Sequence, residues 1–176
     1  MSFLTAMMAI ALTLGGPGPG QQSNEWNKKS TLSTDCPVEL PGIVLEPGVY
    51  IIKLLESKEK RSLVQIWNSD ETQIIATVIA IPDHRSQPEL YNTFTFHDIK
   101  ADGPKPIQTW YYPGDQEGLE FVYPKNRAIE IAKESADRVM ASKTKEGAIV
   151  AVTPNGKEIV IDEPLHLSQT ARRKPQ

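Results

Sequence analysis

The residues most able to do chemistry form a short polar run, Asp83-His84-Arg85. The run follows an apolar stretch and falls in a predicted loop, and loops of this kind often carry function. It is therefore a candidate hydrolase site. The alternative interpretation, which we favour, is structural: Asp83 caps a turn and Arg85 pairs with a nearby side chain.

A second pair, His97-Asp98, raises the question of a metal site. If the predicted strands 73–81 and 92–97 are neighbours, His84 and His97 lie at opposite strand ends, about 17 Å apart. Zinc–nitrogen bonds are about 2 Å long, so one ion cannot bind both rings. The remaining soft ligands are a single cysteine, Cys36, and His166. We therefore expect no metal and no cofactor.

Three acidic residues, Asp115, Glu117 and Glu120, gather around one Pro-Gly turn. A calcium site needs six to eight oxygens, and a glycosidase needs two carboxylates at a set separation. The calcium-loop pattern is absent, as are the nucleophile-elbow, zinc-protease and phosphate-loop motifs. Solvated turn carboxylates are the favoured interpretation.

An aromatic stretch offers a binding surface of a different kind. On a strand, Trp110 and Tyr112 share a face with Gln108, and Tyr111 lies on the other face. If Tyr111 points inward, Trp110 and Tyr112 form an exposed ledge on which a sugar or a peptide could stack. If Trp110 is buried, these aromatics are simply part of the core, which is the commoner outcome.

The elements that must position these residues are mainly strands. Alternation and turn signals predict strands over 49–55, 63–67, 73–81, 92–97, 107–112, 119–123, 147–153 and 157–162. The first three form an antiparallel meander, with 73–81 central and covered on both faces. One short amphipathic helix is predicted over 125–136, with Ala128, Ile129, Ala132 and Ala136 as its apolar stripe. The predicted fold is an antiparallel β-sandwich or small open barrel with this helix against it.

The first twenty residues set the expected location. An uncharged apolar stretch over 3–14 is too short to span a bilayer and has the length of a signal-peptide core. We predict a signal peptide over 1–20, a linker over 21–30, a single β-rich domain over 31–162 and a disordered tail over 163–176. The protein is then exported to the periplasm, cell surface or exterior, and meets the membrane only through its transient leader. A net charge of −3 gives no large basic field for nucleic acid.

Two short sequence motifs, WYYPGD over 110–115 and EFVYPK over 120–125, show a family resemblance. With VELPGIVLEPGVYIIKLL, VQIWNSDET and ATVIAIPDHR upstream, they resemble a family of uncharacterised exported bacterial proteins, over about residues 38–133. The resemblance implies a leader followed by a β domain with a short helix. It implies no activity and no catalytic residues.

We predict a non-enzymatic exported module that binds a partner or has a structural role. Its partner is a protein or a cell-surface glycan, and the candidate contacts are Gln108, Trp110, Tyr112 and the run Asp83-His84-Arg85. The alternative is a hydrolase with its site around that run.

Overall fold

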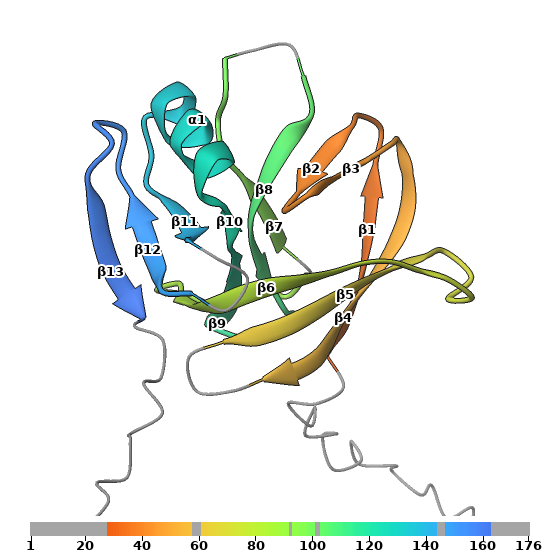
Figure 1. The fold of residues 1–176 in the computed structure, drawn as a ribbon. Helices are drawn as coiled ribbons and strands as arrows, with labels where there is room; N and C mark the ends of the chain where they lie inside the picture. Colours follow the sequence, from red (N-terminus) through yellow and green to blue (C-terminus); the bar gives the residue numbers. More distant parts are fainter. Residues whose placement is uncertain (1–27, 58–60, 92, 101–102, 144–146, 163–176) are drawn as a thin grey trace, which may run out of the picture.

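The computed structural model describes residues 28–57, 61–91, 93–100, 103–143 and 147–162. Within these ranges the chain forms two β-sheets and one α-helix (Figure 1). The strands and the helix are β1 (Lys29–Thr34), β2 (Val38–Leu40), β3 (Ile43–Leu45), β4 (Gly48–Ser57), β5 (Ser62–Asn68), β6 (Ile74–His84), β7 (Thr93–Phe96), β8 (Lys105–Tyr111), β9 (Glu117–Phe121), β10 (Tyr123–Pro124), α1 (Lys125–Ser135), β11 (Val139–Ser142), β12 (Ile149–Val152) and β13 (Glu158–Asp162).

The larger sheet has nine strands in the order β1-β4-β5-β6-β9-β8-β2-β3, with β7 also paired to β8. Neighbours are antiparallel except β2 and β8, which are parallel. The predicted meander is confirmed, because β4 pairs with β5 and β5 with β6. Among the strands that the structure describes, β1 and β3 end the path, so the sheet does not close into a barrel.

The smaller sheet has four strands in the order β10-β11-β12-β13 and lies beside α1 (Figure 1). The strands predicted over 147–153 and 157–162 form an antiparallel hairpin, β12 with β13, and Gly156 in the connecting turn has φ +80°. Glycine adopts such a φ without steric cost, as an Asn-Gly turn between β-branched runs requires. The helix packs on β10, β11 and β12, and buries Ala128, Ile131 and Ala132.

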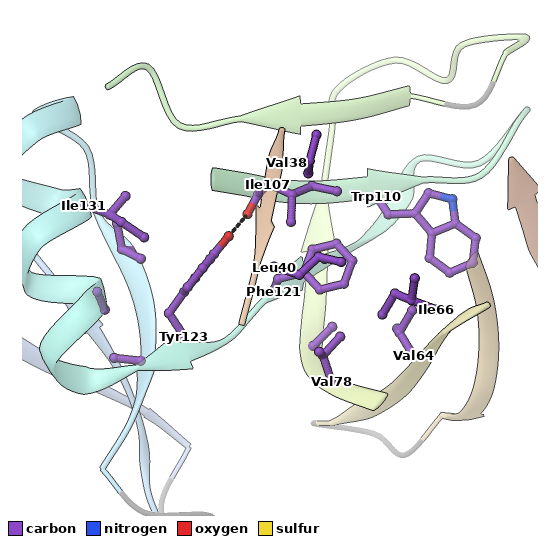
Figure 2. Packing of buried hydrophobic residues seen from close by; sticks show 14 of the residues in the cluster. Val38, Leu40, Val64, Ile66, Val78, Ile107, Trp110, Phe121, Tyr123 and Ile131 are labelled. Carbon is purple, nitrogen blue, oxygen red and sulfur yellow. Dashed lines mark hydrogen bonds between the residues drawn. The ribbon is translucent and has the colours of Figure 1, made fainter. Parts of the chain in front are cut away.

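A shared core joins the two sheets and the helix (Figure 2). Phe121, Trp110 and Tyr123 are its largest buried side chains. The Tyr123 hydroxyl donates a hydrogen bond of 2.8 Å to the Ile107 carbonyl oxygen, which satisfies the one polar atom of that ring (Figure 2). The Trp110 Nε1–H donates to Ser30 Oγ at 2.8 Å and so joins β8 to the edge strand β1. Buried aromatics whose polar atoms are paired contribute both area and a fixed orientation.

The mainly β, sandwich-like prediction with one short helix is confirmed, and several details of it were wrong. The predicted linker 21–30 extends too far, because β1 begins at Lys29. Its polar sequence hides a strand in which Ser30 and Leu32 are buried. The short strands β2, β3, β10 and β11 were not predicted at all, since two to four residues give too little alternation to recognise. The predicted signal peptide and tail lie outside the described residues.

The pairing of strands 73–81 and 92–97, on which the expected separation of His84 and His97 was conditional, does not occur. The partner of β6 is β9, and β7 pairs with β8. The predicted cover on both faces of 73–81 holds only in part, because Ile74 is 45% exposed. In α1, Ile131 is fully buried and Ala136 is an exposed residue beyond the helix end, with φ 60°. The buried stripe is therefore Ala128, Ile131 and Ala132 rather than the predicted set.

Candidate functional site

A polar row crosses three neighbouring strands of the larger sheet. Asp83 in β6 and Tyr111 in β8 both pair in register with Gly118 in β9. Glu120, two residues further along β9, pairs in register with Thr109. Because residues directly opposite each other share a face, these side chains lie on one side of the sheet. Of this set, only Asp83 and Glu120 are candidate site residues from the sequence alone.

Asp83 is held by two hydroxyl groups from β8. Tyr111 Oη donates to Asp83 Oδ2 at 2.6 Å, and Thr109 Oγ1 donates to the same oxygen at 3.3 Å. Burial, and then the hydrogen bond to the Asp83 carboxylate, raise the pKa of the Tyr111 hydroxyl above its ordinary value. The prediction that Asp83 caps a turn was wrong, because it lies within β6 and its partners are on another strand.

Arg85 packs on the Tyr111 ring, with its guanidinium carbon 4.5 Å from the ring centroid. Its Nε–H donates to the Asp115 carbonyl oxygen at 3.0 Å, and Nη1 donates to Thr93 Oγ1 at 3.2 Å. Glu89 lies 3.7 Å from Nη1, so the predicted local ion pair is present. Arg85 therefore ties the loop after β6 to the β8–β9 turn, and its role here is structural.

Glu120 is the most unusual carboxyl group in the row. The residue is 2% exposed, Oε1 has no hydrogen-bond partner, and Oε2 lies 3.5 Å from Arg138 Nη2. Burial raises the pKa of Glu120 to about 7, Arg138 opposes the rise, and the nearby Asp83 carboxylate adds to it. Two carboxyl groups with different protonation states can act as acid and base. With 2% exposure, however, Glu120 is closed to a substrate.

His84 lies apart from this row. Successive strand residues point to opposite faces, so His84 does not join Asp83 and Arg85. It contacts Glu117 instead, with 3.1 Å between Nδ1 and Oε1, and both side chains are largely exposed. The third acid of the predicted group, Asp115, pairs with Lys28 at 2.5 Å. Neither the Asp83-His84-Arg85 run nor the three turn carboxylates converge on one point.

The aromatic ledge is not formed. Trp110 is 2% exposed and Tyr111 7% exposed, so both faces of β8 are covered at this point. Tyr112 is half-buried beside Lys28, whose Nζ lies 5.9 Å from its ring centroid, and Gln108 is half-buried on β8. The exposed ledge is absent because Trp110 packs into the core shared by the two sheets and the helix, and Arg85 lies over the Tyr111 ring on the other face.

His97, the other half of the considered metal pair, is a core residue. It is 3% exposed, its Nδ1 has no hydrogen-bond partner, and its ring meets the edge of Tyr123 at 6.4 Å between centroids. Burial lowers the pKa of His97 to about 4. Over the described ranges, no group of three or more His, Cys, Asp or Glu side chains has an arrangement able to hold a metal ion.

Two further features were not singled out from the sequence. The first is the outer strand β13, where Ile159, Val160 and Ile161 are 47%, 54% and 45% exposed. The second is a groove of about 590 Å³ between β6, β10, the start of α1 and the end of β11. The aliphatic character of β13 is visible in the sequence, as three consecutive aliphatic residues after an Asn-Gly turn. The groove depends on long-range packing and has no sequence signal.

Comparison with known proteins adds no assignment to this geometry. No family model, no curated protein and no solved structure matches the chain. In the part of the chain that the structure describes, no helix has the length and apolarity needed to cross a bilayer.

Proposed function

We propose that this protein is a non-enzymatic interaction module that acts outside the cytoplasm, and that it binds a partner polypeptide by adding a strand to β13. The observation that carries the proposal is the exposed apolar edge of the smaller sheet. Within the described residues β13 pairs with β12 alone, and in Figure 1 it lies at the outer side of the fold.

Edge strands of this composition are usually protected. Natural proteins place charges, prolines or bulges on exposed edges, because free backbone N–H and C=O groups recruit other strands. β13 has an acidic residue at each end and a register irregularity at Ile161, but its middle has the three aliphatic residues Ile159, Val160 and Ile161, all about half exposed. Strand addition satisfies the backbone groups and covers the aliphatic side chains at the same time.

The sequence of β13 favours a different polypeptide over a second copy. Glu158 and Asp162 stand at its two ends. Antiparallel pairing of two copies centred on Val160 would place these acids opposite each other, and like charges directly opposite are destabilising. The partner strand is expected to have β-branched residues flanked by lysine or arginine.

Photocrosslinking in the native cell tests this interaction. A photoreactive residue at position 160 of the full chain should give an adduct with another protein, whereas one at position 49 should not. Val49 is the matched control because it is 46% exposed but lies on β4, which is paired on both sides. An adduct of twice the chain's mass would replace the proposed partner with a second copy. Equal adducts from both positions, or none from position 160, would overturn the proposal.

The hydrolase alternative has weaker support. Asp83 and Arg85 are engaged by Tyr111, Thr109 and the Asp115 backbone, and His84 lies on the opposite face. Burial raises the pKa of Glu120 to about 7, as a general acid would need, but Glu120 is 2% exposed and closed to a substrate. A binding role therefore fits these contacts better than a catalytic one.

The export part of the proposal has a separate test. The intact mass of protein recovered from the exporting cell should lack about the first twenty residues, as expected for signal-peptide cleavage. A full-length product in the cytoplasm would contradict this location without bearing on the strand-addition proposal.

A further inference from the structure

The groove beside α1 runs along one edge of β6. Among the described residues, β6 pairs with β5 over Ile74–Ala80, but it pairs with β9 only over Ala80–His84. After β9 the chain leaves the larger sheet and continues through β10 into α1. One edge of residues 74–78 is therefore left beside the groove, and Thr77 and Val78 line it.

The backbone groups at this edge point toward the groove. The Val122 N–H donates a hydrogen bond of 3.0 Å to the Ile79 carbonyl oxygen, so the backbone of residue 79 faces the β9 side. In an antiparallel strand, residues whose backbone groups face one neighbour alternate with residues that face the other. Thr77 therefore directs its N–H and C=O to the same side as Ile79, at a level that β9 does not reach. Free backbone groups of this kind are a template for another strand.

The rest of the groove is apolar, and the charges at its rim are already paired. Val122 and Tyr123 form part of the wall, and the volume is about 590 Å³. Of the described residues that line the groove, only Lys125 and Lys143 are charged. Their ammonium nitrogens lie 2.6 Å and 2.9 Å from the two carboxylate oxygens of Glu158. Because both lysines already contact a carboxylate, the groove suits an uncharged occupant.

Glu158 connects the groove to the edge of β13. It is the first residue of that strand, and its carboxylate holds both lysines at the groove rim. The start of the β13 edge is therefore next to the groove, and one extended chain can follow both. Two short contact segments on one chain bind more tightly than either alone, because the second contact becomes intramolecular.

We propose that the polypeptide that pairs with β13 continues past Glu158 into the groove and pairs there with the backbone of Thr77. This inference rests on the proposed strand addition to β13 and extends it. The segment in the groove is extended and uncharged, with aliphatic side chains against Val78 and Val122. A charged side chain there would lose its hydration without gaining a partner. The partner is thus defined by two adjoining segments, one for each edge.

Photocrosslinking at two positions of the full chain in the native cell tests this continuity. Photoreactive residues at positions 77 and 160 should give adducts of the same mass, with both crosslinks in neighbouring stretches of one partner sequence. Lys133, in the last turn of α1 and outside the groove, is the control position and should give no adduct. Different partners, distant stretches of one partner, or an adduct from position 160 alone would overturn the groove inference and leave strand addition standing. No adduct from position 160 would overturn both.

A pair of matched variants and an exchange measurement test the groove itself. Thr77→Trp should keep the wild-type melting temperature and lower the adduct yield at position 160 about tenfold. That loss corresponds to about 1.4 kcal/mol, in the range of the two backbone hydrogen bonds at Thr77. Thr31→Trp, at an exposed position of β1, is the control and should leave the yield unchanged. In the unmodified free chain, the Thr77 amide hydrogen should exchange faster than that of Val78, which faces β5. Equal protection of the two amides, or an unchanged yield in Thr77→Trp, would overturn the inference.

Discussion

The Tyr111 ring lies directly against the backbone of Gly118 on the neighbouring strand. A Cβ atom added to Gly118 would be 2.4 Å from Tyr111 Cε1, closer than any real contact. The position of the Tyr111 ring therefore requires glycine at position 118. The hydroxyl of Tyr111 donates a hydrogen bond to Asp83, and Arg85 packs on the face of its ring. The arrangement of Asp83, Tyr111 and Arg85 therefore depends on residue 118 having no Cβ atom.

Gly118→Ala should destabilise the fold by about 1–3 kcal/mol, the usual cost of inserting a methyl group into a well-packed site. Thermal unfolding followed by circular dichroism measures it. The matched control is Gly103→Ala, because an added Cβ there meets nothing within 4 Å. Combining Gly118→Ala with Tyr111→Leu should recover part of the loss. Equal melting temperatures for the two alanine variants would show that Tyr111 moves aside at no cost.

Phe121→Ala should cost about 3–5 kcal/mol, enough to unfold or insolubilise a marginally stable domain. Phe121 is 1% exposed and lies at the centre of the shared core. His84→Ala is the comparison, because the His84 side chain is 59% exposed and contacts the exposed Glu117. Denaturant unfolding should give a much lower free energy of unfolding for Phe121→Ala than for His84→Ala. The reverse order would mean that the loop after β6, and not the hairpin of β8 and β9 that contains Trp110 and Phe121, is central to stability.

How far the sequence predicts this fold depends on the range of the interactions. The β4–β5–β6 meander, the β8–β9 hairpin and the β12–β13 hairpin follow from alternation and turn residues, since each joins neighbours in sequence. The pairing of β6 with β9 and of β1 with β4 brings together distant segments. No local pattern specifies these pairings, so the pairing of β6 with β9 could not be predicted from the sequence.

The difference between local and long-range contacts also explains how much of the candidate site could be predicted from the sequence. Asp83, Tyr111 and Glu120 are 28 and 9 residues apart in sequence, and only the pairing of three strands places them on one face. From the sequence, Glu120 is predicted to be a solvated turn carboxylate, because no local feature shows that it is 2% exposed. Trp110 illustrates the converse: alternation allowed either face, and packing into the core shared by the two sheets and the helix decided it.

His97 should remain neutral well below the pH at which an ordinary histidine is protonated. Burial lowers its pKa from 6.5 to about 4. Because the unfolded chain takes up a proton first, this group removes stability as the pH falls from about 6.5 to about 4, and has no effect above 6.5. A pH titration of the His97 ring by nuclear magnetic resonance measures the pKa directly. A midpoint near 6.5 would show that the ring is hydrated, contrary to its 3% exposure.

Glu120 should produce the opposite dependence on pH. Its pKa in the folded chain is about 7, against an ordinary value of 4.5. Below about pH 4.5 Glu120 is protonated in both the folded and the unfolded chain, so it does not change the free energy of unfolding. As the pH rises from 4.5 to 7 the unfolded chain releases the proton first, and the fold loses stability, by about 3 kcal/mol in all. Above about pH 7 the carboxyl group is ionised in both states, and the loss of stability stays constant.

The neutral isostere Glu120→Gln isolates this contribution. It should melt several degrees above the wild type at pH 8 and at the same temperature at pH 4, because the amide carries no charge to desolvate. Arg138, its partner, is 55% exposed and stays solvated when the carboxylate is removed. Glu134→Gln, an exposed change on α1, is the control and should leave the curve unaltered. If Glu120→Gln lowered the melting temperature at pH 8, the pairing of Glu120 with Arg138 would outweigh the desolvation of its carboxylate, and this buried acid would be a stabilising ion-pair partner.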